Sequence, residues 1–376
     1  MPDLKFLQNK QPVVGVLGSH SALEVCYGAS QEGLSNIVIC QEGRDKIYST
    51  YYKKQTWNGQ TTGCVDEVVI LNNFAEILQD EVQEELLSKR VVFVPHRSFE
   101  VYVCRDDYSV LRDRFRLPIF GNRHLLEAEE RTVSYNQYTL LQKAQIKHPK
   151  QFAKPSQIDR LVIVKVNEAT RNYERGFFFA QNKDDFMKTA DQLIAENKIT
   201  EKALKQAVIE EFIIGPTINL NFFYSPIYNR LELIGTDTRR QTNIDGYNNL
   251  TAAQQLELQK QGILPNFEEA GHIAATLIES MLDQAFEIGH SFVQACQREF
   301  QDGIIGPFAL QCVIKAGPPK KEFVVYDVSL RMPGSPGIKF TPYSEYFFGR
   351  PVSMGQRVAM EIKQAHKLDC LNKILT

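Results

Sequence analysis

The chain has 376 residues and a mass of 43.0 kDa, which is enough for two or three domains with cores of their own. Hydrophobic residues make up 43% and charged residues 23% of it, and the net charge of −2 argues against general binding to nucleic acid or anionic membranes. It shows no signal-peptide pattern, no apolar run near the roughly 20 residues of a membrane span and no CxxC among its scattered cysteines, so we expect a cytoplasmic protein with reduced thiols.

The first 125 residues alternate short apolar runs with stretches of helical periodicity. PVVGVLG at residues 12–18 predicts a buried strand, SHSALEVCYGASQEG a helix that ends at Gly33, and SNIVIC a second strand. DEVVIL, a helical stretch and VVFVPH continue the alternation. We therefore expect a doubly wound, mostly parallel sheet, with ligands binding beside the turn that contains Ser19 and His20.

Beyond residue 126 the apolar runs carry polar residues. A helical stretch, LLEAEERTVSYNQYTLLQKAQI, precedes RLVIVKV, a predicted strand that ends near Lys165. A long helix is expected near residues 183–197, followed by VIEEFIIG, a strand with Glu210 and Glu211. TINLNFFYSP and LELIGTDTRR alternate like antiparallel strands, and one or two helices are expected over residues 268–300.

The last part of the chain predicts a strand pair, GPFALQCVIK and FVVYDVSLRMPG, and then an amphipathic helix, SMGQRVAMEIKQAHKL. These changes of pattern divide the chain into three segments, namely residues 1–125, 126–215 and 216–376.

One lysine and several oxygen-bearing side chains are spaced along these strands as a metal–triphosphate complex requires. The strand pair offers Gln311, Asp327, Ser329 and Arg331, and the earlier strand offers Lys165. Carboxylate and amide oxygens suit Mg²⁺ or Mn²⁺, and cations neutralise phosphate oxygens. A nucleotide-dependent enzyme is therefore favoured, whereas a nicotinamide dehydrogenase is disfavoured because the first turn lacks GxGxxG.

The order of lysine strand, glutamate strand and late metal-binding strand pair resembles the ATP-grasp superfamily. Nine motifs together resemble the archaeal-type, formate-dependent 5-formaminoimidazole-4-carboxamide ribonucleotide (FAICAR) synthetase family: LGSHSAL, EGRD, VPHRSF, PIFGNR, IEEFIIG, FFYSP, TNIDG, GIIGPFALQ and SMGQRVAMEIK. The resemblance runs from about residue 12 to the end of the chain. It implies an α/β and α+β architecture, with an ATP-grasp fold preceded by the parallel-sheet domain.

The same resemblance implies an ATP-dependent carbon–nitrogen ligase of purine synthesis. In the family, ATP phosphorylates formate, and the exocyclic amine of 5-aminoimidazole-4-carboxamide ribonucleotide (AICAR) attacks the formyl phosphate. ATP and Mg²⁺ or Mn²⁺ are the implied cofactors, formate and AICAR or a related amino-nucleotide are the implied substrates, and a homo-oligomer such as a trimer or hexamer is the implied assembly.

The resemblance also assigns roles to individual residues. Lys165 and Arg331 are the implied catalytic residues. The implied ATP contacts are Lys165, Arg171, Arg175, Glu210, Glu211, Phe212, Ile213 and Gln241. The implied substrate contacts are His20, Ser98, Asn243 and His272. The implied metal ligands are Gln311 and Asp327.

Purely structural roles stay open as alternatives for several of these residues. Gln311 also fits a core amide whose hydrogen bonds are made within the protein, and Arg331 also fits an ion-pair partner of Asp327 without a catalytic role. Because adjacent strand residues point to opposite faces, only one of Glu210 and Glu211 is expected to meet the nucleotide. Arg239-Arg240 and Asn243 fit an active-site mouth or an exposed turn about equally.

The chain departs from the family pattern around the substrates. The glycine-dense phosphate loop is replaced by NEATRNYERGFFF, which keeps only Gly176, so that phosphate contact would depend more on Arg171 and Arg175. Asp327 stands for the usual glutamate and is followed by PGSPG.

Two single positions also differ. His272 stands where the family has an asparagine that contacts the carboxamide, and Arg97 where it often has glycine. A ligase acting on another acid or amine, or a nucleotide-binding subunit without turnover, therefore remains an alternative. The retained Lys165, Glu210 and Gln311 favour the formyl ligase itself.

Overall fold

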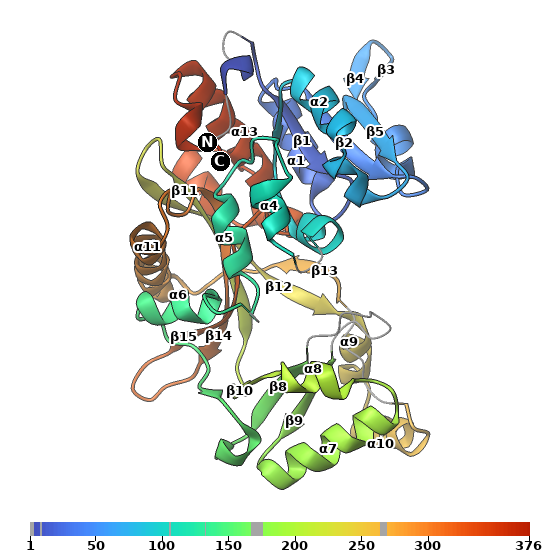
Figure 1. Cartoon of the computed structure of the whole chain (residues 1–376). Helices are drawn as coiled ribbons and strands as arrows, with labels where there is room; N and C mark the ends of the chain where they lie inside the picture. Colours follow the sequence, from blue (N-terminus) through green and yellow to red (C-terminus); the bar gives the residue numbers. More distant parts are fainter. Residues whose placement is uncertain (1–3, 8–9, 105–106, 132, 167–175, 264–268) are drawn as a thin grey trace.

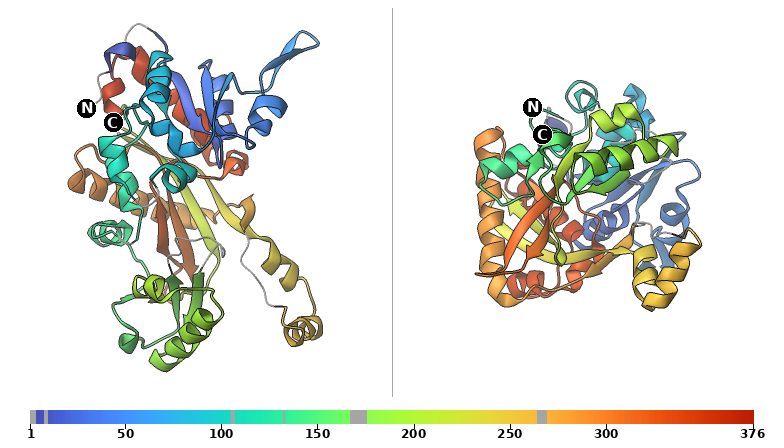
Figure 2. Two further views of the ribbon diagram at one scale, coloured as in Figure 1. Left: turned by 45° about the vertical axis from the view of Figure 1, so that its right-hand side comes forward. Right: turned by 90° about the horizontal axis from the view of Figure 1, so that it is seen from below.

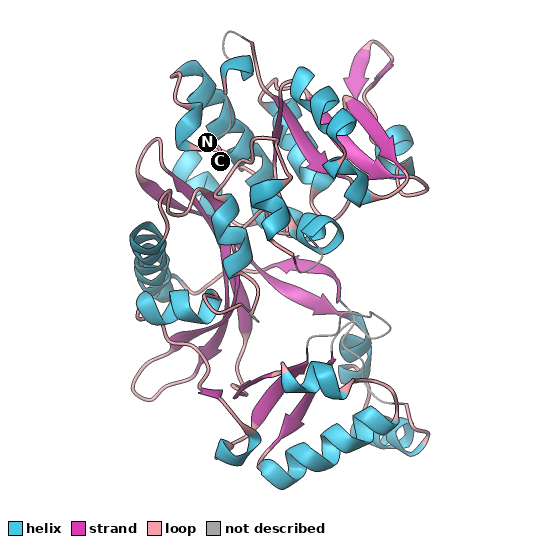
Figure 3. Cartoon of the chain, in the orientation of Figure 1, coloured by secondary structure: helices cyan, strands magenta, loops and turns pink. Residues whose placement is uncertain are grey.

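The computed structural model describes residues 4–7, 10–104, 107–131, 133–166, 176–263 and 269–376. Its main strands form three sheets that follow one another along the chain, with helices packed around them (Figures 1 and 3). The first sheet is parallel and the other two are antiparallel.

The first sheet has four parallel strands in the order β5-β2-β1-β6. Its strands are β1 (Val13–Leu17), β2 (Asn36–Gln41), β5 (Glu67–Leu71) and β6 (Val91–Phe93). The helices around it are α1 (Ala22–Gln31), α2 (Asp80–Ser88), α3 (Arg97–Phe99) and α4 (Ser109–Asp113). A two-stranded hairpin, β3 (Gln55–Trp57) and β4 (Gln60–Thr62), projects away from this sheet (Figure 2). The expected parallel N-terminal sheet is confirmed.

The second sheet has four antiparallel strands in the order β7-β10-β8-β9. Its strands are β7 (Gln151–Phe152), β8 (Val162–Val166), β9 (Gly176–Ala180) and β10 (Val208–Glu211), and its helices are α7 (Lys183–Ala195) and α8 (Glu201–Lys205). Val162 and Val164 of β8 enter the core that this sheet shares with α7. Because side chains alternate along a strand, Lys165 emerges on the opposite face.

The third sheet has five antiparallel strands in the order β13-β12-β11-β14-β15. Its strands are β11 (Thr217–Ser225), β12 (Arg230–Gln241), β13 (Glu269–Ala274), β14 (Gly306–Lys315) and β15 (Glu322–Ser329). One face packs under α11 (Leu282–Glu299), where the ring of Phe308 stacks on those of Phe222 and Phe292 at 5.4 and 5.6 Å. This aromatic core leaves the other face for the polar side chains described below.

Two helical expectations are wrong in part. Residues 269–274 form β13, an edge strand, because their backbone pairs with β12 and Gly271 adopts a φ of 151° that side-chain-bearing residues rarely take. The stretch after residue 122 is two helices, α5 (Arg123–Ala128) and α6 (Gln137–Lys143). Asn136 starts the second by accepting a hydrogen bond from the backbone of Tyr138 at 3.0 Å.

The C-terminal helix α13 (Met354–Lys367) packs against α1, far away in sequence. The helices approach closely at Gly28 and Gly355, where an added Cβ would meet backbone atoms at 2.1 and 2.2 Å. The remaining helices are α9 (Thr242–Asn248), α10 (Ala252–Lys260) and α12 (Tyr343–Phe348). The three-segment division stays a proposal: each segment holds one main sheet, although α13 packs with the first. In the described part of the chain, helices fall short of the length and apolarity that a bilayer crossing demands.

Candidate active site

A row of polar side chains crosses the face of the third sheet that α11 leaves uncovered. Asp327 of β15 lies directly opposite Gln311 of β14, Gln311 opposite Asn219 of β11, and Asn219 opposite Asp237 of β12. Arg239 lies two residues beyond Asp237, on the same face. The antiparallel register therefore brings the two implied metal ligands together.

Positive charges surround Asp327. The guanidinium of Arg131 donates a hydrogen bond from Nη2 to Asp327 Oδ1 at 2.6 Å. Burial alone would raise the pKa of the Asp327 carboxyl, but Arg131, Lys165 and Arg239 outweigh it and lower the pKa to about 2. Asp327 is thus a permanent anion inside a group of three cations.

Lys165 faces the same group from the second sheet. Its ammonium pairs with Glu210 of the neighbouring strand, whose side chain is only 2% exposed. Tyr138 Oη donates to the other oxygen of Glu210 at 2.6 Å, and the ring of Tyr326 lies 5.7 Å from Lys165 Nζ. Burial lowers the pKa of Lys165, and Glu210 partly offsets this effect. Lys165 is therefore held in place beside Asp327.

Glu211 lies on the other side of the same strand, as alternation requires. It accepts a hydrogen bond from Arg160 at 3.3 Å and stands apart from the Lys165–Glu210 pair. Phe212 continues the chain with its ring against that of Phe179, 4.7 Å between centroids. Of the two glutamates, Glu210 alone joins the charged group around Lys165 in this structure.

The donor set of Gln311 and Asp327 fits a hard divalent cation that also binds a triphosphate. Among the described residues, no cluster of three or more His, Cys, Asp or Glu side chains is placed to hold a metal ion. Mg²⁺ commonly takes one or two protein oxygens and completes its shell with phosphates and water. Both donors already face cations, because Gln311 Oε1 accepts from Arg239 Nη2 at 2.7 Å. The site therefore suits a metal that arrives with the nucleotide.

A second group of polar residues lies at the carboxyl ends of β1 and β6. Ser98 Oγ donates to Ser19 Oγ at 3.0 Å, and Arg44 reaches the same hydroxyl at 3.4 Å. His20 is exposed, has a φ of 45°, and stacks its ring on that of buried His96 with 5.7 Å between centroids. The structure thus brings His20 and Ser98, both implied substrate contacts, to one edge of the parallel sheet.

Arg331 does not pair with Asp327, so that interpretation is wrong. Its guanidinium donates to Glu129 Oε1 at 2.7 Å and lies 3.4 Å from Glu100 Oε1, because the chain has left β15 and turned toward the parallel sheet. Arg97 joins the group through Glu100 at 2.8 Å. Burial and the neighbouring Glu129 raise the pKa of Glu100 to about 7. Arg331 therefore belongs to a group of two arginines and two glutamates beside the parallel sheet.

The proline-bearing loop at 333–337 connects the two polar groups. The carbonyl of Pro333 accepts from Ser21 Oγ at 2.6 Å, and Gly334 lies so near the His20 ring that an added Cβ would come within 2.4 Å of it. Ser335 Oγ lies 3.2 Å from Nδ1 of His272, which also pairs with Asp237. His20 and His272 thus contact neighbouring residues of one loop.

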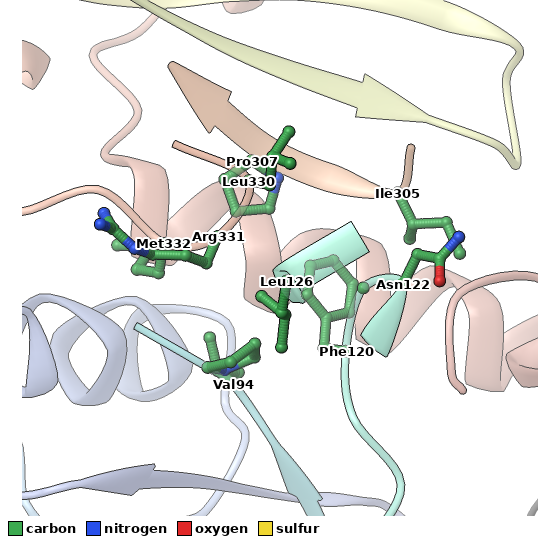
Figure 4. Close-up of a pocket in the computed structure, with 11 residues that line it drawn as sticks. Val94, Phe120, Asn122, Leu126, Ile305, Pro307, Leu330, Arg331 and Met332 are labelled. Carbon is green, nitrogen blue, oxygen red and sulfur yellow. The ribbon is translucent and has the colours of Figure 1, made fainter. Parts of the chain in front are cut away.

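A small cavity lies where β6, β14 and the end of β15 converge (Figure 4). Its volume is about 10 Å³, room for roughly one water molecule. Figure 4 shows the guanidinium of Arg331 directed away from the apolar group of Val94, Phe120 and Leu126. A larger hollow of about 430 Å³ beside the start of α11 contains none of the described candidate residues. Neither cavity is the candidate site.

Four implied contacts cannot be placed. Arg171 and Arg175 lie outside the described residues, and the side chains of Gln241 and Asn243 are likewise not described. Other residues join the site without having been predicted, among them Arg131, Tyr138 and Asp237. Arg131 lies in the loop before α6 and Tyr138 in α6 itself. Both fall in the stretch predicted as helix, but no sequence signal connects them to the strands of the site. Asp237 was detectable as an acidic residue within an apolar strand.

Known proteins resemble the chain over almost its whole length. Residues 14–152 match a family described as a protein of unknown function (DUF1246), and residues 185–376 one described as a domain of unknown function (DUF1297). A 5-formaminoimidazole-4-carboxamide-1-(beta)-D-ribofuranosyl 5'-monophosphate synthetase of Methanopyrus kandleri is 36% identical, over 96% of this chain and 94% of its own. The synthetase of that name from Methanocaldococcus jannaschii is 35% identical, over 98% and 96%.

Solved structures share the fold. The IMP biosynthesis protein PurP of Thermococcus kodakaraensis superposes with a TM-score of 0.68 at 26% identity, over 96% of this chain and 100% of that one. An N5-carboxyaminoimidazole synthetase of Staphylococcus aureus, complexed with ADP, has a TM-score of 0.57 at 12% identity, over 94% and 78%, which shows the fold alone. The predicted ATP-grasp fold is confirmed. The chain belongs to the family of 5-formaminoimidazole-4-carboxamide ribonucleotide synthetases.

Proposed function

We propose that this protein uses ATP to activate formate and transfers the formyl group to the exocyclic amine of AICAR, in the purine pathway that leads to IMP. The observation that carries the proposal is the group of Lys165, Arg131 and Arg239 around Asp327 and Gln311. Three cations beside two oxygen donors suit a metal-bound triphosphate. Full-length similarity to synthetases named for this product supports the choice of substrates.

In this proposal the triphosphate lies between the second and third sheets. Lys165 and Arg131 contact its terminal phosphoryl oxygens, and Glu210 and Tyr138 hold the lysine in place. Among the described residues the buried Nε of Arg131 has no hydrogen-bond partner, so it retains a donor for an anionic oxygen. Gln311 and Asp327 hold Mg²⁺ or Mn²⁺, which when bound supplies charge neutralisation for phosphoryl transfer. Glu210, Glu211, Phe212, Ile213, Gln241, Arg171 and Arg175 remain proposed ATP contacts.

The ribonucleotide binds at the edge of the parallel sheet. Ser98, Ser19 and the exposed ring of His20 supply donors for its phosphate and ribose there, and Asn243 and His272 remain proposed contacts. Arg331, which follows β15 and pairs with Glu129 and Glu100, remains the second proposed catalytic residue. The fixed packing of the 333–337 loop against His20 keeps the amine site near the acyl phosphate and away from bulk water.

We further propose a cytoplasmic homo-oligomer, a trimer or hexamer, that binds neither nucleic acid nor membrane. The cysteine thiols are free, and six of the seven are buried, which suits a reducing compartment. Light scattering coupled to size-exclusion chromatography measures the assembly: a mass near three or six times 43.0 kDa supports it, and a monomer contradicts it.

The activity is tested by ADP release with each component omitted in turn. Release that needs Mg²⁺, ATP, formate and AICAR together supports the proposal. Release with another carboxylate or another amine instead identifies a diverged ligase, which the His272 substitution favours as the second candidate. Nucleotide binding in a calorimeter, with no release for any acid or amine tested, identifies a non-catalytic subunit.

A further inference from the structure

Gln137, the first residue of α6, is a buried amide beside the outer edge of β15. Its Oε1 accepts a hydrogen bond from the backbone N–H of Val328 at 2.7 Å, and its Nε2 donates to the carbonyl of Glu129 at 2.8 Å. The same amide hydrogen-bonds the carboxylate of Asp327. Because the Val328 N–H follows the Asp327 carbonyl in one rigid peptide unit, Gln137 contacts both the side chain and the backbone of the implied metal ligand.

The rest of the connector between α5 and α6 supports the same edge. Among the described strands β15 is the edge strand of the third sheet, so the N–H groups on its outer side need partners from elsewhere. Glu129 Oε2 accepts from the N–H of Leu330 at 3.0 Å, two residues beyond the N–H that Gln137 accepts. Side chains of the connector therefore take positions that a further strand would occupy, and they determine where the end of β15 lies.

The position of this edge matters because Asp327 carries its carboxylate on a short side chain. An aspartate has one methylene less than the glutamate that the family resemblance implies, so its carboxylate follows the backbone more closely. Pairing with β14 brings Asp327 opposite Gln311, but strand pairing does not by itself fix the torsions of the carboxylate. Hydrogen bonds from neighbouring groups orient ligating carboxylates, and their loss typically lowers metal affinity by about 10- to 100-fold. Gln137 makes such a bond and also holds the adjoining peptide unit.

We infer that Gln137 is a positioning residue for the divalent cation, because it fixes the Asp327 carboxylate beside Gln311; the inference rests on the proposed function, which supplies the metal. The Oε1 of Gln137 is engaged by Val328 and its Nε2 by oxygen acceptors, so Gln137 acts through Asp327 and is not itself a metal ligand. Arg131 neutralises the same carboxylate, whereas the neutral amide of Gln137 constrains it without adding charge. A role limited to holding the fold would instead appear in stability alone.

Calorimetry of ADP binding with and without saturating Mn²⁺ measures the contribution of the metal without any reaction. The ratio of the two Kd values gives the factor by which Mn²⁺ tightens ADP binding. Gln137→Met keeps the length of the side chain and removes its hydrogen bonds. We expect it to lower this factor by about tenfold, the lower end for partners of metal ligands, and to leave Kd without Mn²⁺ within about twofold. Gln137→Asn, whose amide is one methylene shorter, should lie between Gln137→Met and the unmodified chain.

Gln83→Met is the matched control, because Gln83 is also buried but lies in α2 beside the parallel sheet. Its Oε1 accepts from the N–H of Arg116 at 2.6 Å, and its Nε2 donates to the carbonyl of Arg114 at 3.0 Å. We expect a similar fall in unfolding temperature and an unchanged Mn²⁺ factor.

The inference is overturned if the Mn²⁺ factor in Gln137→Met equals that of the unmodified chain, or if Gln83→Met lowers it as much as Gln137→Met does. Gln137→Asn decides the question in the same way if Gln137→Met does not fold. ADP binding that Mn²⁺ does not tighten in the unmodified chain would instead contradict the proposed metal site.

Discussion

Replacing Asp327 with asparagine tests the metal–triphosphate site most sharply. The change removes one negative charge and keeps the size of the side chain. Asp327 is hydrogen-bonded to Arg131 at 2.6 Å, and three cations act on it. A carboxyl pKa of about 2, against an ordinary 3.8, corresponds to about 2 kcal/mol of net favourable interaction between the ionised group and its surroundings.

A neutral amide at this position loses that interaction. A loss of about 2 kcal/mol corresponds to a factor of about 30, since 1.36 kcal/mol is tenfold. We therefore expect kcat/KM for Mg–ATP to fall by about 30-fold or more in Asp327→Asn, because the metal loses charge in addition. The assay is ADP release with saturating formate and AICAR over a range of Mg²⁺ concentrations.

Asp327→Glu is the matched control, since it keeps the charge and restores the residue that the family resemblance implies. We expect it to stay within about tenfold of the unmodified chain, with both variants unfolding at a similar temperature. Equal activity of Asp327→Asn and the unmodified protein at every Mg²⁺ concentration would refute the assignment of Asp327 to the metal.

Three further outcomes follow from the same structure. Lys165→Gln should lower formate-dependent ¹⁸O scrambling in ATP by at least about 100-fold, because a neutral amide does not offset phosphoryl charge, and unchanged scrambling would remove Lys165 from the site. Arg131→Gln should weaken ATP binding measured by calorimetry by about tenfold, while the exposed-pair control Arg112→Gln should leave it unchanged; equal affinities in both would count against Arg131. Burial lowers the pKa of His96 to about 4, so the unfolded chain binds a proton near pH 6.5 that the folded chain does not, and stability is lost as the pH falls from 6.5 toward 4. His96→Gln should therefore lose less stability than the unmodified chain between pH 7 and pH 5 in urea unfolding, and equal losses would contradict this explanation.

The strands that carry the site were predictable because their chemistry is local. An apolar run with one lysine, and a strand pair with Gln311 and Asp327, are recognisable from their residue types and from the spacing of their apolar positions. That the two ligands lie directly opposite each other depends only on antiparallel register, which two adjacent strands and a short turn determine. The opposite positions of Glu210 and Glu211 likewise followed from strand alternation.

The features of the site and fold that could not be predicted from the sequence depend on contacts between distant parts of the chain. Arg131 reaches Asp327 across 196 residues, and no spacing rule connects a loop before a short helix to a strand so far away. The same applies to Arg331, which sits near the β15 end yet turns to Glu129, 202 residues earlier. The edge strand β13 was mistaken for helix because its residues lack period-two alternation, and pairing with β12 decided its conformation.

The pairing of Asp237 with His272 is a third instance. Each residue was visible in the sequence, one inside a strand and one at a departure from the family pattern. Their relation appeared only when β12 and β13 were aligned, since the two residues are 35 positions apart. His272, which stands where the family has an asparagine, therefore has a hydrogen-bond partner in the neighbouring strand, Asp237.

We propose that one site couples ATP cleavage to transfer of formate onto an amine. Incubation of the protein with [¹³C]formate, Mg–ATP and AICAR, followed by NMR and nucleotide analysis, measures both products at once. We expect one ¹³C-formamido group for each ADP released, and neither product in Lys165→Gln. ADP release without ¹³C in the nucleotide, or no ADP at all from the unmodified chain, would contradict it.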